Sequence, residues 1–272
     1  MPNKIISEKI APVLTVNNLS SCLGTKKILD DISFSVSKGE IFVIMGASGS
    51  GKTTLLRHLV GLGKTDVGEV TLLGNKLQSI GDAELFELRK RIGVAFQSGA
   101  LINSMSVIEN VELPLRQHTN LDSSTIQIMS RMKLDMVSLS GAEDLKPAQL
   151  SGGMLKRAGL ARAVVMDPQV LFFDEPSAGL DPVTSVELDE LIIGLRNSLK
   201  MTVIVVTHEL ESAIKIADRI MILADGGVVA CGTVNEIQAS TDTRVQSMLH
   251  RRVRERRAGD DKYLDHLTHH AN

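Results

Sequence analysis

A glycine-rich stretch between an apolar run and a helical run constrains the fold of this chain more than any other feature. Residues 46–53 read Gly-Ala-Ser-Gly-Ser-Gly-Lys-Thr and match the pattern G-x-x-x-x-G-K-[ST]. The apolar run 41–45 before them has the length of a buried strand, and residues 54–57 after them favour a helix. A strand, a glycine loop and a helix in this order form a cradle of main-chain N–H groups for phosphate. This context favours a phosphate-binding α/β domain over a chance match in a glycine-rich turn.

The polar residues of this loop predict how it would hold a nucleotide. Lys52 would neutralise charge on the β- and γ-phosphates, and Thr53 would offer its hydroxyl to Mg²⁺. Main-chain N–H groups at the helix start would hold further phosphate oxygens. The residues expected to bind ATP are Gly46, Ala47, Ser48, Gly49, Ser50, Gly51, Lys52, Thr53 and Thr54.

Apolar runs and helical patterns alternate along most of the chain, which favours a largely parallel sheet. Residues 170–173 and 203–206 repeat the pattern of a buried strand, and residues 184–199 have helical spacing. Residues 106–146 read as mostly helical, so we expect a helical insertion there. Residues 219–232 predict a β-hairpin.

Composition argues against several classes of function. With 43% hydrophobic and 23% charged residues the chain can form a packed core, and a net charge of −2 gives no reason to expect a nucleic-acid partner. No apolar run approaches the roughly 20 residues that span a bilayer. Residues 1–11 lack the apolar centre of a signal peptide. Cys22 and Cys231 lie far apart, which favours buried, reduced thiols over a metal site and fits a reducing cytosol.

Two acidic residues follow the predicted strand 170–173. Asp174, at the strand end beside the phosphate loop, can hold Mg²⁺, usually through water. Glu175 can then orient and activate an attacking water. Acidic residues are also common at strand ends for other reasons, but the phosphate loop upstream favours the catalytic interpretation.

A second anion-binding element is predicted at Ser151-Gly152-Gly153, which precedes a helical run at residues 155–165. One nucleotide has one triphosphate, which the first loop already serves. The second element therefore suggests that two chains sandwich ATP. Ser151 could also simply cap its own helix, and both roles are compatible.

The order of these motifs resembles the nucleotide-binding domain of ABC transporters over about residues 12–240. Residues 46–53 match its Walker A loop, Asp174 ends its Walker B strand, and Leu150-Ser151-Gly152-Gly153-Met154 matches its signature loop. The resemblance implies a P-loop NTPase fold with a largely parallel core sheet, an antiparallel β subdomain and a helical subdomain at about residues 98–165. It also implies that Ser151, Gly152 and Gly153 act in trans.

Three further segments match the family. Gln97 resembles the Q-loop glutamine, which contacts Mg²⁺ and senses the transporter, and His208 resembles the switch histidine near the γ-phosphate. Residues 177–181 resemble the D loop. The resemblance implies catalytic roles for Glu175 and His208. The implied Mg²⁺ ligands are Thr53, Gln97 and Asp174.

One departure concerns the base of the nucleotide. Many members of the family stack an aromatic ring on adenine near the end of the first strands. Residues 16–33 contain no aromatic residue here, and Leu23 stands about where the ring is expected. Base selectivity could therefore be weaker, or a ring could come from elsewhere.

A narrower resemblance is to the Mla-type ATPases, which energise phospholipid transport at the Gram-negative envelope. It is carried by residues 96–101, 112–116 and 244–249, and by Met154 in the signature. It implies an ATPase that maintains outer-membrane lipid asymmetry. Its partners would be a second ATPase subunit, a transmembrane permease, an MCE-domain lipid-binding protein and a small STAS-domain protein, at the cytoplasmic face of the inner membrane.

Two other functions stay open, an ATPase serving an importer of a small solute and a soluble ABC ATPase without a permease. A P-loop kinase fits poorly, because it has no use for Ser151-Gly152-Gly153 in trans.

The C-terminal part changes character near Thr241, so we expect an ABC ATPase domain at 1–240 and an extension at 241–272. Apolar residues recur at helical spacing over 245–253, residues 250–257 are rich in arginine, and Tyr263 is the only tyrosine. We expect this extension to cross to the partner subunit, with a solvated tail as the alternative.

Overall fold

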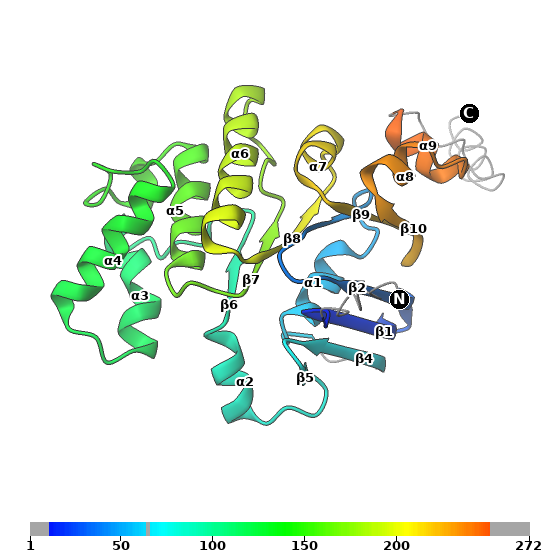
Figure 1. Ribbon diagram of the computed structural model, residues 1–272, viewed down its shortest axis with the longest axis horizontal. Coiled ribbons are helices and arrows are strands. Elements are labelled where there is room, and N and C mark those ends of the chain that lie inside the picture. The colour runs from blue at the N-terminus through cyan, green and yellow to red at the C-terminus, as the bar shows by residue number, and fades with distance from the viewer. Residues whose placement is uncertain (1–10, 64–65, 251–272) are drawn as a thin grey trace, which may run out of the picture.

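Residues 11–63 and 66–250 are described by the computed structural model in Figure 1. The strands in chain order are β1 Leu14–Leu23, β2 Lys26–Val36, β3 Ile41–Met45, β4 Val67–Leu72, β5 Asn75–Lys76, β6 Ile92–Ala95, β7 Val170–Asp174, β8 Thr202–Thr207, β9 Arg219–Ala224 and β10 Gly227–Thr233. The α-helices are α1 Lys52–Leu59, α2 Asp82–Arg89, α3 Val107–His118, α4 Ser123–Met136, α5 Gly152–Val164, α6 Pro182–Leu199, α7 Leu210–Ile216, α8 Val234–Gln238 and α9 Thr243–Leu249.

A six-stranded sheet with the order β10-β9-β3-β8-β7-β6 runs through the centre of the molecule (Figure 1). All its neighbouring strands pair in parallel except β10, which pairs antiparallel with β9 at the edge. Every residue of β3, β7 and β8 is buried. Strands covered on both faces need continuous apolar runs, and this is why three short runs predicted these strands correctly.

A second sheet, with the order β2-β1-β4-β5, is antiparallel and lies beside the central one (Figure 1). Its inner side chains share one apolar core with β3 and α1. Phe34 of β2 stacks on Phe42 of β3, with 5.4 Å between the ring centroids. The two sheets and the helices confirm the α/β P-loop fold with an antiparallel β subdomain.

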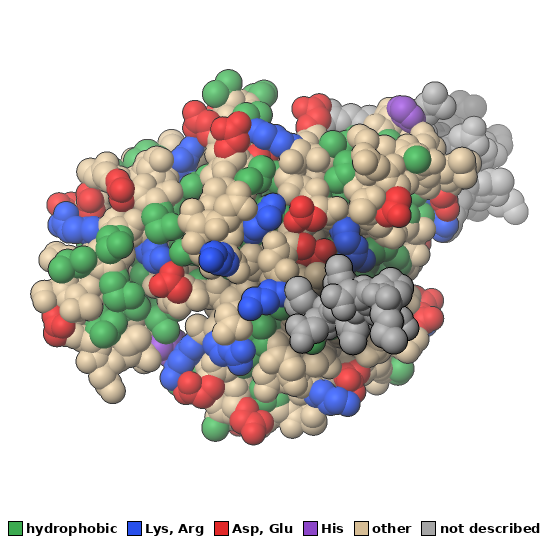
Figure 2. Space-filling view, in the orientation of Figure 1, with side chains coloured by type: hydrophobic (Ala, Val, Ile, Leu, Met, Phe, Trp, Pro, Cys, Tyr) green, Lys and Arg blue, Asp and Glu red, His purple; other side chains and the backbone are tan. Residues whose placement is uncertain are grey.

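Helices α3, α4 and α5 pack together at the end of the molecule away from the second sheet (Figure 1), and α3 and α4 confirm the helical insertion predicted at residues 106–146. Helix α3 begins with a capping box in which Ser106 and Glu109 satisfy each other's main-chain N–H groups. Buried Asn110 holds the preceding loop, because its side chain accepts from Ile102 N and donates to Ile102 O. Hydrophobic side chains gather on the surface at this end (Figure 2).

The predicted hairpin forms from β9 and β10, and two short helices follow it. Helix α9 begins after Asp242, whose side chain accepts a hydrogen bond from Arg244 N. Val245 is fully buried in the main core, so α9 packs on the domain that precedes it. Residues 251–272, including Tyr263 and most of the arginine-rich run, lie outside the described residues, and their crossing to a partner subunit stays a prediction.

The expectation of buried cysteines is wrong. Cys22 and Cys231 are both exposed free thiols. Cys22 lies near the end of β1, on the face of its sheet away from the core, and Cys231 lies on the edge strand β10. In the two described ranges, no helix is long and apolar enough to cross a bilayer.

Two helical glycines differ in the space around them. A Cβ built on Gly159 of α5 would lie 2.9 Å from the Cα and the O of Gly99, whereas a Cβ on Gly194 of α6 would meet no atom within 4 Å. Gly99 follows Gln97 closely in the chain, so this approach of two backbones holds the Gln97 loop against α5.

We expect Gly159→Ala to lower the free energy of unfolding by about 1–3 kcal/mol through overpacking. Gly194→Ala should raise it by roughly 0.5–1 kcal/mol, because alanine loses less conformational freedom than glycine in a helix. Urea denaturation of both variants measures the difference. Equal effects of the two substitutions would contradict the close approach at Gly99.

Candidate functional site

A cleft of about 660 Å³ opens where the central strands end. Met45, the last residue of β3, is level with Thr207 of β8, and Val206 of β8 is level with Asp174 of β7. The segments that follow these neighbouring strands therefore meet at one edge of the sheet, the usual place for ligands in such folds. The residues that line the cleft are Lys26, Ile28, Ser48, Gly49, Gly51, Lys52, Thr53, Thr54, Gln97, Glu175 and His208.

The loop between β3 and α1 has little room for side chains. Gly51 has a φ of 102°, and a Cβ there would lie 2.9 Å from Leu29 Cδ2 and 3.1 Å from Ile28 O. Glycine is therefore required at the residue that precedes α1. Lys52 begins the helix, and its Nζ donates to Gly46 O at 2.8 Å and to Ala47 O at 3.1 Å.

Lys52 lies between this loop and a carboxylate. Its Nζ is 3.8 Å from Glu175 Oε1, and both side chains are largely buried. Burial lowers the pKa of Lys52, and the nearby Glu175 and Asp174 carboxylates oppose that shift. The result is a cation held at a helix N-terminus, where an anionic ligand would be attracted by both the charge and the helix dipole.

Asp174 lies at the end of β7 with one oxygen unsatisfied. It is 8% exposed, and its Oδ1 is buried without a hydrogen-bond partner. Burial is the main cause that raises the pKa of Asp174, the Glu175 carboxylate adds to it, and the Lys52 and Lys156 ammonium groups oppose it. An orphaned carboxylate oxygen is a costly feature that a cation would satisfy.

The oxygen donors expected for Mg²⁺ fit this requirement. Thr53 and Gln97 line the cleft, and Asp174 lies behind it at the strand end. Within the described ranges, no three His, Cys, Asp or Glu residues cluster as a metal site. A hard cation here would therefore depend on hydroxyl, amide and carboxylate oxygens completed by water and phosphate, as Mg²⁺ typically does.

Glu175 is fixed by its main chain and by His208. Its φ of 48° is left-handed, and its N donates to Val206 O at 2.8 Å. Its Oε2 lies 2.8 Å from His208 Nδ1 and accepts a hydrogen bond from His208 N at 3.3 Å. A carboxylate held in this way at the cleft wall can orient a water for attack on a bound phosphate.

Ser151 lies at the N-terminus of α5, and its Oγ accepts a hydrogen bond from Met154 N at 3.2 Å. The capping role left open by the sequence is therefore present. Ser151 and Gly152 are exposed, and neither they nor Gly153 line the cleft of their own chain. A role for this helix start in phosphate binding would need a second chain.

Some contributors to the site were missed from the sequence. Lys26 and Ile28 of β2 line the cleft, whereas Leu23, at the end of β1, is 78% exposed and does not. Lys156 of α5 reaches the main chain of Glu175. A lysine five residues after Ser151 was visible in the sequence, but its target depends on how α5 packs against the strand ends.

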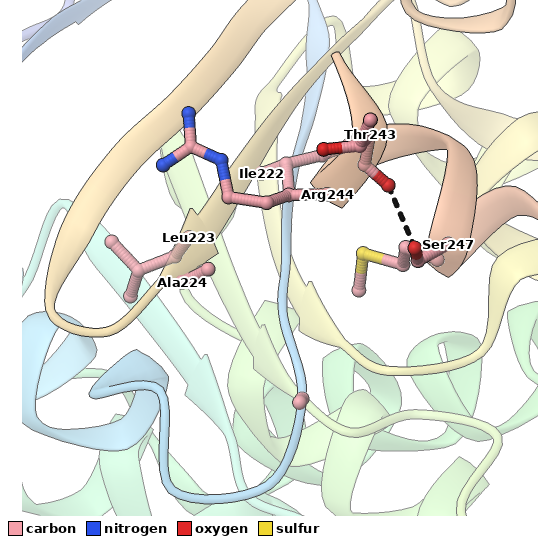
Figure 3. A pocket seen from close by; sticks show the side chains of 8 residues that line it. Ile222, Leu223, Ala224, Thr243, Arg244 and Ser247 are labelled. Atoms are coloured by element: carbon pink, nitrogen blue, oxygen red, sulfur yellow. Dashed lines mark hydrogen bonds between the residues drawn. The ribbon is translucent and has the colours of Figure 1, made fainter. Parts of the chain in front are cut away.

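A smaller cavity of about 230 Å³ lies between the end of β9 and α9 (Figure 3). Its lining is largely apolar, with Ala47 of the phosphate loop at one side, and Ser247 Oγ donates to Thr243 O across the first turns of α9 (Figure 3). It contains no carboxylate, so the larger cleft is the candidate site.

Comparison with known proteins gives three findings. The family model described as "ABC transporter" matches residues 29–178. The chain is 41% identical over 244 residues to the "Intermembrane phospholipid transport system ATP-binding protein MlaF" of Escherichia coli, covering 90% of this chain and 91% of that protein. It is 37% identical over 239 residues to the "Probable ribonucleotide transport ATP-binding protein mkl" of Mycobacterium tuberculosis, covering 88% of this chain and 67% of that protein.

The fold also matches a solved dimer. The structure described as a dimeric post-hydrolysis state of the ATP-binding cassette MJ0796, bound to ADP and Pi, aligns with a TM-score of 0.75 and 32% identity. The alignment covers 81% of this chain and 98% of that one.

The position of Lys52 predicts a clear separation of binding from folding. Lys52→Met removes the ammonium but keeps most of the buried stem, so the melting temperature without nucleotide should change little. At 100 times its Kd, ATP should stabilise the unchanged chain by about 2.7 kcal/mol, and this gain should be lost in the variant. Thermal melts with and without ATP measure both, with Lys76→Met, a surface lysine paired with Glu69, as the control. Full stabilisation of Lys52→Met by ATP would contradict the role of this side chain.

Proposed function

The chain belongs to the ABC transporter family, and on this premise we propose that it binds and hydrolyses ATP to energise phospholipid transport. The observation that carries the proposal is the cleft in which Lys52 lies between the phosphate-loop carbonyls and Glu175. The similarity to MlaF over nine-tenths of the chain supports phospholipid as the cargo.

The phosphate loop would hold the triphosphate of ATP. The N–H groups around Gly49, Gly51 and the first turn of α1 would donate hydrogen bonds to phosphate oxygens, since they lie at a helix N-terminus. The γ-phosphate would compete with the Glu175 carboxylate for Lys52, which lies 3.8 Å from it. Binding would therefore release Glu175 from one charge partner while leaving its main chain in place.

Thr53, Gln97 and Asp174 would hold Mg²⁺, with Asp174 acting through water. The orphaned Oδ1 of Asp174 supports this assignment. When bound, the ion would offset negative charge on the β- and γ-phosphates.

Glu175 would act as the general base, taking a proton from the attacking water at its carboxylate. His208 would hold that carboxylate through the contact between Nδ1 and Oε2 and would reach toward the γ-phosphate. The left-handed main chain at Glu175, whose N donates to Val206 O, sets the direction in which this side chain leaves the strand end.

Two chains would complete each site. Ser151, Gly152 and Gly153 do not line their own cleft, so their N–H groups and hydroxyl would contact ATP held by the partner chain. The similar dimeric cassette structures support this arrangement. ATP would then favour the closed pair because it contacts both chains.

The wider assembly is part of the same proposal. A transmembrane permease would dock near Gln97 at the cytoplasmic face of the inner membrane, with an MCE-domain protein and a small STAS-domain protein as further partners. Large apolar side chains are exposed on the surface of the chain, among them Phe96, which precedes Gln97, and Phe86 of α2. Exposed aromatic side chains of this kind are typical of protein contacts.

The role of Glu175 is tested by Glu175→Gln. The amide keeps the size of the side chain but cannot accept a proton, so hydrolysis should slow by at least roughly 10²-fold. ATP binding should remain, and a closed dimer with trapped ATP should accumulate. Turnover and nucleotide content of the purified complex measure this, and unchanged turnover would remove Glu175 from the mechanism.

The cargo is tested in the complex that co-purifies with the chain from membranes. Phospholipid should be found in that complex, and phospholipid vesicles should stimulate its ATPase activity, whereas ribonucleotides or small solutes as cargo should not. Stimulation by a solute instead would support an importer. A soluble dimer without a membrane partner would support the non-transport alternative.

A further inference from the structure

A buried lysine connects the helix that begins at Ser151 to the carboxylates of the same chain. Lys156 lies on α5, five residues after Ser151, and is only 6% exposed. Its Nζ donates a hydrogen bond to the main-chain O of Glu175 at 2.9 Å. Burial lowers the pKa of Lys156, and the nearby Glu175 and Asp174 carboxylates oppose that shift. Burial of this amine has a desolvation cost, which the hydrogen bond to Glu175 O and the two carboxylates offset.

The hydrogen bond from Lys156 holds the main chain at Glu175, where the chain turns after β7. The N of Glu175 donates to Val206 O of β8, and its O accepts from Lys156, so both main-chain polar groups of this left-handed residue are held from different elements. The direction of the Glu175 side chain follows from that peptide. Moving the peptide would shift the carboxylate away from His208.

Lys156 differs from Lys52 in how its charge can respond to ATP. Lys52 lies in the phosphate loop and would turn to the triphosphate, which weakens its pairing with Glu175. Lys156 projects from α5, which packs against β6, α3 and α4. Its charge would therefore remain beside Asp174 and Glu175 after nucleotide has bound.

We propose that Lys156 is a positioning residue for hydrolysis, holding the main chain at Glu175 and tying it to the helix that carries Ser151. The proposal rests on the proposed role of Glu175 as general base. Ser151 would meet the ATP of the partner chain, so α5 links contact with one nucleotide to the geometry of the carboxylate that acts on the other. Contact of Ser151 with ATP at one site would therefore help to position Glu175 at the other site.

The test compares three substitutions of Lys156 in the full chain, purified with its membrane partner. Lys156→Met removes the charge and the donor, Lys156→Gln keeps a donor without charge, and Lys156→Arg keeps both. Lys133→Met is the matched control, because Lys133 is also a buried helical lysine but pairs with Asp167, away from the cleft. Turnover, ATP affinity and thermal stability are measured for each.

Lys156→Met should lower kcat by about 10-fold to 100-fold, while ATP affinity stays the same. The fall should not exceed the contribution of the general base itself, which is roughly 10²–10⁴-fold. Lys156→Arg should restore most of the activity, and Lys133→Met should leave kcat unchanged. If Lys156→Met does not fold, Lys156→Gln carries the same test, with a smaller fall expected because a donor remains.

A double substitution separates positioning from general support of the fold. In a Glu175→Gln background, Lys156→Met should cause no further fall in single-turnover hydrolysis, since it acts through the carboxylate. An equal fall in both backgrounds, a parallel loss of ATP affinity, or no rescue by arginine would overturn the proposal. If Glu175→Gln itself leaves turnover intact, the proposed function fails instead, which is a distinct result.

Discussion

The balance of buried charge at the edge of the central sheet is the interaction on which the rest of the structure depends. Asp174 ends β7 and Glu175 follows it, and Lys52 and Lys156 reach these carboxylates from two different helices. Each of the two ammonium groups offsets part of the negative charge of the adjacent carboxylates. The arrangement therefore depends on α1 and α5 both holding a lysine at the same strand ends. Under the proposed function, Lys52 would exchange Glu175 for a phosphate.

The parallel sheet brings these lysines and carboxylates together. Strands β3, β8 and β7 are neighbours in space although more than 100 residues separate β3 from β7 in the chain. Their common direction brings the phosphate loop, His208 and Glu175 to one edge. Ser151, at the start of α5, is exposed and does not line this cleft. Under the proposed function, a second chain would therefore have to bring its nucleotide to Ser151.

Local patterns in the sequence predicted the fold well because the strongest signals are short-range. Each of these signals can be recognised from a few neighbouring residues. They are the apolar runs of β3, β7 and β8 and the glycine-rich loop at residues 46–53. The contact from Lys156 could not be predicted, since its acceptor is a main-chain oxygen whose direction depends on the left-handed φ of Glu175. The exposure of Cys231 was missed for a related reason, because strand order decides which strand lies at an edge.

Under the proposed function, each ATP lies between the phosphate loop of one chain and the Ser151 helix of another. The most direct measurement counts trapped ATP in a mixed dimer, formed in a Glu175→Gln background from one chain with Ser151→Arg and one with Lys52→Met. Only one composite site is intact in that dimer. We predict one trapped ATP per mixed dimer and none in either variant alone. A mixed dimer that forms but traps no ATP, or one that traps two, would contradict the account.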